Sequence, residues 1–492
     1  MRSTVPLGWS TSALATCDRP MRIGGKPVFR SESISVHHPF DGRSIGSVPV
    51  ARCADVQAAI ASALTCRPTL SREDRSLILR RVAVALESQA HAAADLITLE
   101  SGLCKQDTQD EVARAIAALN VAGAELLRDD GELFSDAASG MQKGRRIITQ
   151  REPLLGVIAA VTPFNHPLNQ VAHKLIPAVA TNNRVVLKPS EKTPLSALFL
   201  VNLFYEAGYP PEALSVVTGE PTEIVSEFLT HPDVAAFAFT GSADVGKRLA
   251  LQTGWRRTIF ELGGNDALIV MDDADLEQAA QLALRGAFRN SGQRCTAVKR
   301  IVVQDGIADE FVERLVFLAQ RWTHGNPFAN GVDMGTLIDT TAATRVQARV
   351  QAALDAGARL CCGHVRQGAL YAPTVLDRVP TGCELVTEET FGPVAPVMRF
   401  ANIDDAIALV NGTRFGLAAG LCTQRMDYIA RFIAELQVGM INIGEVPSYR
   451  SMLAPFGGVK DSGNGAREGI RHAMRNFTNL KCVSLPWSGS CF

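Results

Sequence analysis

The fold is decided by a short apolar segment that ends in a polar turn, Val157-Ile-Ala-Ala-Val161-Thr-Pro-Phe-Asn-His-Pro167. Five consecutive apolar residues without alternation are typical of a parallel strand buried on both faces. The turn places Asn165 and His166 at the carboxyl end of this strand, which is the edge of an open α/β sheet where ligands bind. The stretch therefore predicts a parallel sheet with a binding site at residues 162–167.

Three more apolar segments, 184–188, 214–217 and 235–239, follow the same plan, and each ends in a turn. A strand-turn-helix alternation at a spacing of roughly 20 to 30 residues predicts a doubly wound α/β fold. The pattern restarts after residue 263 with the apolar segments 267–270 and 300–303. This restart predicts a second α/β domain.

Composition excludes several classes of protein. The chain has 492 residues, of which 47% are hydrophobic, and this length suggests two or three domains. Its 49 basic and 50 acidic residues give a net charge of −1, so charge provides no case for nucleic acid or an anionic membrane as a partner. The 11 cysteines form neither a C-x-x-C pair nor a metal-ligand spacing, so we expect free thiols, no metal and a reducing cytoplasm. No apolar run approaches the roughly 18 residues of a membrane helix.

A candidate nucleophile, Cys295, lies in the segment 290–300, Asn-Ser-Gly-Gln-Arg-Cys-Thr-Ala-Val-Lys-Arg. A thiol reacts as the thiolate, and the adjacent guanidinium of Arg294 together with a helix start would lower its pKa. Gly292 lets the backbone approach a reacting carbonyl, and the Cys295 N–H would then donate to a developing oxyanion. The alternative is a buried, inert cysteine in an apolar helix.

Three further features are ambiguous when each is taken alone. The turn 240–246 opens a helix whose first N–H groups suit a pyrophosphate, but such loops are also common tight turns. Lys188 and Glu191 follow another strand at the same edge, where Glu191 is either a ribose acceptor or a charge at a helix N-terminus. Glu261, beside two glycines, could activate a water, and the Asn165 side-chain amide could donate to an oxyanion.

Together these residues point to one family. The chain resembles the aldehyde dehydrogenase superfamily from about residue 23 to residue 487. The motifs that carry the resemblance, in family order and at family spacing, are Thr162-Pro-Phe-Asn-His-Pro, Leu187-Lys-Pro-Ser-Glu, Phe239-Thr-Gly-Ser-x-x-x-Gly, Glu261-Leu-Gly-Gly, Gly292-Gln-x-Cys, Glu389-x-Phe-Gly-Pro and Pro455-Phe-Gly-Gly. The resemblance implies an α/β fold with a Rossmann-like cofactor domain, an α/β catalytic domain and a small β oligomerisation arm.

The resemblance also implies the chemistry. Cys295 would attack the aldehyde, Asn165 and the Cys295 N–H would hold the oxyanion, and Glu261 would activate the water that hydrolyses the thioester. NAD is the implied cofactor, because Glu191 would place a negative charge where NADP carries its 2′-phosphate. The implied cofactor-binding residues are Thr162, Pro163, Lys188, Ser190, Glu191, Gly241, Ser242, Gly246, Leu262, Glu389 and Phe391.

The same resemblance predicts how the chain is divided. Residues 21–135 and 151–263 would form the NAD-binding domain, and residues 264–478 the catalytic domain. The segment 136–150 would form the arm together with the tail 479–492 and join subunits into a homodimer or homotetramer. Residues 1–20 are expected to be a flexible N-terminal extension.

Four cationic positions concern the substrate. Arg294 directly precedes the nucleophile, His166 follows Asn165, Arg114 lies in Glu-Val-x-Arg, and Arg450 lies six residues before Phe456. Family members with these features act on aldehydes that carry a phosphate or phosphonate. The runs Asn-His-Pro-Leu-Asn-Gln, Gly-Gly-Asn-Asp and Asp-Ser-Gly-Asn-Gly are similar to those of phosphonoacetaldehyde dehydrogenases. The resemblance thus implies NAD-dependent oxidation of phosphonoacetaldehyde to phosphonoacetate.

Alternatives stay open at this point. The cations could pair with internal acids, or the substrate could be glyceraldehyde 3-phosphate, sulfoacetaldehyde or succinic semialdehyde. A CoA-acylating dehydrogenase is disfavoured because such members lack the glutamate base. A non-catalytic structural member is disfavoured because Cys295, Glu261 and Asn165 are all present.

Overall fold

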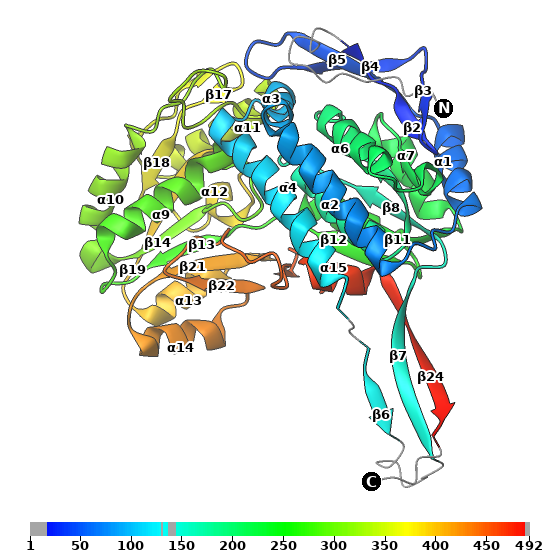
Figure 1. Ribbon diagram of the computed structural model, residues 1–492. Coiled ribbons are helices and arrows are strands. Elements are labelled where there is room, and N and C mark those ends of the chain that lie inside the picture. The colour runs from blue at the N-terminus through cyan, green and yellow to red at the C-terminus, as the bar shows by residue number, and fades with distance from the viewer. Residues whose placement is uncertain (1–16, 129–130, 136–143, 488–492) are drawn as a thin grey trace.

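The computed structural model describes residues 17–128, 131–135 and 144–487. The chain forms two lobes, each built on a seven-stranded sheet, and an arm of antiparallel strands that extends away from them (Figure 1). No helix within these ranges is long and apolar enough to cross a membrane. In the same ranges, no group of three or more His, Cys, Asp or Glu side chains could hold a metal ion.

The first sheet has the strand order β12-β11-β8-β9-β10-β2-β3. Its strands are β2 (Met21–Ile23), β3 (Lys26–Val28), β8 (Val157–Val161), β9 (Arg184–Lys188), β10 (Leu214–Val216), β11 (Val234–Thr240) and β12 (Arg257–Glu261). The five strands from β12 to β10 are parallel, and the hairpin β2–β3 adds an antiparallel edge. The predicted strand 157–161 is confirmed as β8, which lies between β11 and β9.

Helices cover both faces of this sheet. They are α1 (Cys53–Thr65), α2 (Arg72–Ser88), α3 (Ala90–Ser101), α4 (Lys105–Glu125), α5 (Asn169–Ala180), α6 (Leu195–Glu206), α7 (Pro221–Thr230) and α8 (Ala243–Ala250). Successive strand side chains point to opposite faces, so Ile158 and Ala160 pack with α2 to α6, whereas Val157, Ala159 and Val161 pack with α1 and α7. This two-sided burial is why β8 reads as an unbroken apolar run.

The second sheet has the order β15-β18-β19-β14-β13-β21-β22 and is parallel except for β15. Its strands are β13 (Ala267–Val270), β14 (Arg300–Gln304), β15 (Arg359–Cys362), β18 (Thr374–Asp377), β19 (Val394–Phe400), β21 (Ala418–Cys422) and β22 (Met440–Ile443). One face is covered by α9 (Leu276–Phe288) and α10 (Asp305–Ala319). The other face is covered by α11 (Thr340–Asp355), α13 (Ile403–Asn411) and α14 (Met426–Glu435). The boundary at residue 263 stays a prediction; it falls between β12 and β13.

Two buried carboxylates cap helices of the first lobe. Glu100 accepts hydrogen bonds from two backbone N–H groups at the start of α6, at 2.8 and 3.0 Å. Glu111 accepts from the N–H groups of Leu168 and Asn169 at the start of α5, at 2.8 and 2.9 Å. Each carboxylate satisfies donors that have no partner inside their own helix. Burial raises the pKa of Glu100 to about 8.

The arm consists of β7 (Arg145–Pro153) and β24 (Thr478–Pro486), which pair antiparallel along their whole length, with β6 (Leu133–Ser135) as a short third strand. This register confirms the predicted pairing of the polar segment with the tail. Both strands extend further toward the lobes than predicted. Residues 136–143 and 488–492, which the arm prediction includes, lie outside the described residues.

The predicted flexible extension, residues 1–20, is wrong for its last residues, because residues 17 and 18 belong to a sheet. β1 (Cys17–Asp18) pairs in parallel with β5 (Ser44–Pro49), which pairs in turn with β4 (Ser33–His37). Backbone hydrogen bonding therefore joins residues 17 and 18 to a three-stranded sheet, and residues 1–16 lie outside the described chain. The remaining short elements are β16 (Arg366–Gln367), β17 (Leu370–Tyr371), β20 (Phe415–Gly416), β23 (Val459–Lys460), α12 (Glu384–Thr387) and α15 (Ile470–Asn476).

Candidate active site

A left-handed turn joins the end of α9 to Cys295. Asn290 (φ 59°), Ser291 (φ 52°) and Gly292 (φ 69°) follow one another in the left-handed region. This conformation costs roughly 1–2 kcal/mol for each residue with a Cβ, so surrounding contacts must hold it. At Gly292 a Cβ would also lie 2.1 Å from the Gly392 carbonyl oxygen, which requires glycine at this position.

The carboxylate of Asp107, in the first turn of α4, holds this nucleophile turn. It accepts hydrogen bonds from the Asn290 backbone N–H at 2.7 Å and from the Arg289 side chain at 2.8 Å. The Asn290 side-chain amide donates to the carbonyl oxygen of Asn165 at 3.0 Å. The turn is thus fixed both to α4 and to the segment that follows β8.

Two donors are available for an oxyanion. The side-chain amide of Asn165 donates one N–H to the Gln293 carbonyl oxygen at 2.9 Å and keeps its second N–H. The backbone N–H of Cys295 has no acceptor among the residues that the structure describes. Asn165 and Cys295 both line a cavity of about 520 Å³ between the lobes. The predicted pair of oxyanion donors is therefore brought together.

The surroundings of the thiol differ from the prediction. Burial raises the pKa of Cys295, and Lys299 is the cation that opposes this rise most. Arg294 donates instead to the carbonyl oxygens of Arg285 at 3.0 Å and Gly286 at 2.6 Å, at the C-terminal end of α9. The predicted net lowering of the Cys295 pKa is wrong, because burial outweighs the nearby cations. Arg294 still acts electrostatically on Cys295, although its guanidinium donates to the end of α9.

Lys299 is a site residue that was not predicted from the sequence. Its ammonium donates to the carbonyl oxygens of Cys295 at 2.6 Å and Gly264 at 2.8 Å, and it pairs with Glu389 at 3.0 Å. It therefore connects the nucleophile to the Glu-Leu-Gly-Gly segment and to a predicted cofactor-binding carboxylate. The only sequence signal for it was its place four residues after the nucleophile.

Glu261 ends β12 and lines the same cavity as Cys295. Neither of its carboxylate oxygens has a hydrogen-bond partner in the described part of the chain. Burial and the neighbouring carboxylate of Glu468 raise the pKa of Glu261 well above its ordinary value. A carboxyl group with a raised pKa is a stronger base once ionised, which suits the activation of water.

A buried ion pair lies close to Glu261. Lys174 on α5 pairs with Glu468, and both side chains are almost fully buried. The Lys174 ammonium lowers the pKa of Glu261, opposing the effect of Glu468. The pair could not be predicted from the sequence, because a lysine inside an apolar helix and an isolated glutamate form no motif.

The predicted cofactor-binding residues lie along this cavity or directly behind its wall. Those that line it are Pro163, Glu191, Gly241, Ser242, Leu262, Glu389 and Phe391. Thr162, Lys188, Ser190 and Gly246 do not line it. Lys188 nevertheless pairs with Glu191 at 3.1 Å, and burial lowers the pKa of Lys188.

The cavity wall formed by α8 fits the phosphates of a dinucleotide. The helix begins at the cavity, and its N-cap Ser242 accepts a hydrogen bond from the Val245 N–H at 3.4 Å. Free N–H groups and the helix dipole favour a phosphate at this end. Gly246 permits the close approach of α8 to Leu262, because a Cβ there would lie 2.3 Å from the leucine side chain.

The four cationic residues predicted to bind substrate gather near Cys295. Arg114 is partly buried and has no hydrogen bond or ion pair with any described residue; burial and the neighbouring Arg450 lower its pKa to about 10. Arg294 and Cys295 also act electrostatically on Arg114. The His166 Nδ1 lies 3.5 Å from a carboxylate oxygen of Glu111, and burial lowers the His166 pKa.

Arg450 is fixed by two contacts. Its Nη2 donates to His173 Nε2 at 3.0 Å, and its guanidinium lies 4.5 Å from the centre of the Phe456 ring. All four cationic residues are described by the structure, and none of them lines the cavity that Cys295 shares with the predicted cofactor residues. The cations therefore form a second group around the nucleophile, separate from the cofactor cavity.

Comparison with known proteins gives a consistent result. The sequence matches the model of the aldehyde dehydrogenase family over residues 29–483. A 3-sulfolactaldehyde dehydrogenase of Priestia aryabhattai is 36% identical over 94% of this chain and 97% of its own length. The NADP(+) succinate-semialdehyde dehydrogenase of Escherichia coli (strain K12) is 36% identical over 92% of this chain and 95% of its own length.

A solved structure is equally similar. The NADP-dependent glyceraldehyde-3-phosphate dehydrogenase from Bacillus halodurans C-125, complexed with NADP, superposes with a TM-score of 0.93 and is 34% identical, covering 96% of this chain and 100% of that chain. Fold and site together define an NAD(P)-dependent oxidoreductase that acts on aldehydes. The match over nearly the whole chain is more specific: the protein belongs to the aldehyde dehydrogenase family.

Proposed function

We propose that the protein oxidises a short anionic aldehyde, phosphonoacetaldehyde, to phosphonoacetate with NAD. The observation that carries the proposal is Arg114, a guanidinium close to Cys295 that has no bonded acceptor among the described residues. A partly buried cation that has lost water without gaining a partner is stabilised by a bound anion. The similar proteins named above act, by their names, on aldehydes that carry a sulfonate, a carboxylate or a phosphate.

The three arginines would contribute differently to the anion site. Arg294 already donates through its terminal nitrogens to protein oxygens, and its Nε has no partner within the described chain. Arg450 donates one hydrogen bond to His173 and keeps its other N–H groups. We therefore assign the main contacts to Arg114 and Arg450, and a fixed supporting charge to Arg294.

His166 adds a proton-dependent contact. If its Nδ1–H points to Glu111, a neutral imidazole offers only a lone pair at Nε2, and it donates to the anion only when protonated. A bound dianion together with Glu111 would stabilise the imidazolium, so we expect substrate binding to take up a proton at neutral pH. Calorimetry in two buffers of different ionisation enthalpy measures this uptake, and equal heats in both buffers would contradict it.

The reaction follows from the chain's own groups. The Cys295 thiolate would attack the aldehyde carbon, and the resulting oxyanion would accept hydrogen bonds from the Cys295 N–H and the free N–H of Asn165. A bound nicotinamide supplies the acceptor for the substrate hydride. Glu261 would then take a proton from the water that attacks the Cys295 thioester, releasing the acid and the thiol.

We propose NAD as the cofactor because of Glu191. Its carboxylate lines the cavity and is held by Lys188. Like charges about 4 Å apart repel by roughly 4 kcal/mol at an effective dielectric constant near 20, so the 2′-phosphate of NADP would be disfavoured. Glu191→Ala should raise kcat/KM for NADP relative to NAD. Equal values for NAD and NADP in the unmodified enzyme would contradict the assignment.

A panel of aldehydes assayed with NAD and with NADP tests the proposed substrate. We expect the highest kcat/KM for phosphonoacetaldehyde, lower values for sulfoacetaldehyde, succinic semialdehyde and glyceraldehyde 3-phosphate, and poor turnover of propionaldehyde. Preference for another anionic aldehyde would keep the anion site and replace the substrate. Equally efficient turnover of propionaldehyde would reject the anion site itself.

We further propose that the arm joins subunits into a homodimer or homotetramer and that the division near residue 263 separates two domains. The arm supports this, because β6, β7 and β24 project from the lobes with exposed apolar side chains such as Phe134 and Leu480. Light scattering coupled to size-exclusion chromatography measures the mass, and a monomer would contradict the proposal.

A further inference from the structure

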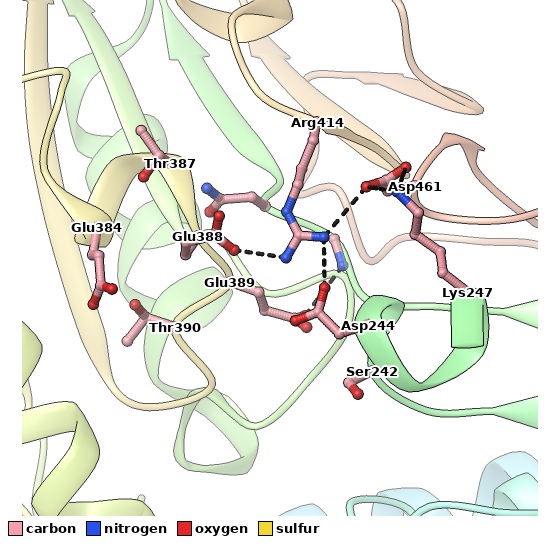
Figure 2. A network of polar contacts seen from close by, with 12 residues as sticks. Ser242, Asp244, Lys247, Glu384, Thr387, Glu388, Glu389, Thr390, Arg414 and Asp461 are labelled. Carbon is pink, nitrogen blue, oxygen red and sulfur yellow. Dashed lines mark hydrogen bonds and ion pairs between the residues drawn. The ribbon is translucent and has the colours of Figure 1, made fainter. Parts of the chain in front are cut away.

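Arg414, between α13 and β20, donates to carboxylates from three different segments (Figure 2). Its guanidinium bonds to Asp244 at 2.9 Å, Glu388 at 2.7 Å and Asp461 at 3.3 Å. Lys247 completes the group, because its ammonium donates to both oxygens of Asp461 at 3.0 and 2.9 Å. We call these five residues the strap.

The strap joins two walls of the cofactor cavity. Asp244 lies in the first turn of α8, the helix that begins at Ser242, and Glu388 directly precedes Glu389. Asp244, Glu388 and Arg414 all line the cavity. Because α8 packs on the first lobe while Glu388 and Arg414 belong to the second, the strap crosses from one lobe to the other.

The strap is a network, which distinguishes it from an isolated surface pair. The Arg414 side chain is 31% exposed and that of Asp244 is 72% exposed, so a single pair of this kind would contribute little. In the strap, however, one ordered guanidinium serves three carboxylates, and the entropy lost in ordering it is shared. The hydrogen bond to Glu388 raises the pKa of Arg414, so the guanidinium stays charged at any physiological pH.

We propose that Arg414 is a positioning residue for the cofactor and that the strap slows release of the dinucleotide by holding the two cavity walls together. This rests on the proposed placement of the cofactor in this cavity. Ser242 and Glu389 line opposite lobes of this cavity, so a dinucleotide lying between them would be released more readily as the two walls separate. Asp244 moves with α8 and Glu388 with the Glu389 segment, so parting the walls breaks bonds of Arg414.

A different role for Arg414 would be to neutralise charge alone. Without it, Asp244 and Glu388 would repel the phosphates of the cofactor, and removing Arg414 would again weaken binding. The two roles differ in the effect of Asp244→Asn. If the strap holds the walls together, Asp244→Asn breaks one of its bonds and release becomes faster. If charge neutralisation were the only role, Asp244→Asn would remove a repelling charge and release would become slower.

Stopped-flow measurement of release tests the proposal. Full-length enzyme loaded with NADH is mixed with excess NAD, and the decay of bound-NADH fluorescence gives the dissociation rate. We expect a roughly 5- to 30-fold faster rate in Arg414→Gln and a roughly 2- to 5-fold faster rate in Asp244→Asn, as for the loss of several partly exposed ion pairs. Arg414→Lys, which keeps the charge without the three-way geometry, should lie in between.

A matched control is Arg431→Gln. Arg431 on α14 bonds to Asp404 at 2.6 Å and to Glu435 at 2.8 Å, with similar exposure, and it does not line the cavity. Its release rate should equal that of the unmodified enzyme. An unchanged rate in Arg414→Gln, or a slower one in Asp244→Asn, overturns the strap.

A marker variant separates failure of the strap from failure of the cofactor placement. Glu191→Ala should weaken NADH binding, because Glu191 lines the cavity as the proposed acceptor for the ribose and does not belong to the strap. If Glu191→Ala binds more weakly while Arg414→Gln releases NADH normally, the strap alone is rejected. If neither variant changes NADH binding, the placement of the cofactor is rejected and the strap with it.

Discussion

The Asp107 carboxylate accepts a hydrogen bond from the Asn290 backbone N–H at 2.7 Å, across 183 positions of sequence. The same carboxylate accepts from Arg289, so a single side chain on α4 holds the left-handed turn that presents Cys295. Without it, no described hydrogen bond from α4 reaches Asn290 or Ser291, and the two residues can relax toward ordinary backbone angles.

We therefore expect Asp107→Ala to lower kcat/KM by about 100-fold, as for a misplaced nucleophile, with a smaller loss of stability of about 1.5–3 kcal/mol. Steady-state kinetics and denaturant unfolding measure the two effects. Asp110→Ala is the matched control, because Asp110 also pairs with Arg289 but is largely exposed and does not contact the turn. Equal activity loss in both variants would show that only the Arg289 ion pair matters.

The raised pKa of Glu100 predicts a pH dependence of stability. Its pKa is about 8 in the folded protein and near its ordinary value of 4.5 in the unfolded chain. The protonated form of Glu100 thus adds at most about 5 kcal/mol to the free energy of unfolding. This contribution is fully present below pH 4.5 and is lost as pH rises to about 8. Glu100→Gln stays neutral, so its melting temperature should fall less between pH 5.5 and 8.5.

The control for this prediction is Glu435→Gln, which removes an exposed carboxylate from α14. It should keep the pH dependence of the unmodified protein. An identical pH dependence in Glu100→Gln would mean that the folded protein already ionises Glu100 at low pH, with the two N–H donors of α6 compensating for burial.

Much of the fold could be predicted because its signals are local. β8 reads as an apolar run since both of its faces are covered, and α8 follows a glycine-containing turn capped by Ser242. Cys295, Asn165 and Glu261 could be found because each lies at a turn or strand end whose neighbours are constrained.

The rest depends on contacts between distant segments. Asp107, Lys174 and Glu468 act through partners that are far away in the sequence, so no spacing marks them. Arg294 illustrates a different limit of sequence-based prediction. It is adjacent to Cys295 in the sequence, yet the carbonyl oxygens at the end of α9 set the orientation of its guanidinium. Sequence proximity located this guanidinium but could not give its orientation.

The different surroundings of the arginines predict different effects on substrate binding. Arg114→Gln should raise KM for phosphonoacetaldehyde by roughly 10- to 150-fold, as for a lost charge-assisted hydrogen bond of about 1.5–3 kcal/mol. Arg294→Gln should raise KM less, because its terminal nitrogens are already engaged by protein oxygens. Propionaldehyde serves as the internal control, since its low activity should be unchanged in Arg114→Gln. A larger effect for Arg294 than for Arg114 would reverse the assignment of the main contact.

The last prediction concerns the two halves of the reaction. Cys295→Ser should abolish oxidation, because a hydroxyl ionises far less readily than a thiol and no described residue accepts a hydrogen bond from this side chain. Glu261→Gln should keep a first-turnover burst of NADH, since attack by Cys295 and hydride transfer do not need this carboxylate. It should slow later turnovers by about 100-fold, because a general base is lost.

In the unmodified enzyme the steady-state rate should rise with pH through the raised pKa of Glu261, because only the ionised form accepts a proton from water. Glu261→Gln should lose this rise while its burst amplitude stays near one per active site. Stopped-flow absorbance of NADH at several pH values measures burst and steady state together. A variant that loses the burst would place Glu261 in the first half of the reaction, and one with an unchanged steady-state rate would remove it from the mechanism.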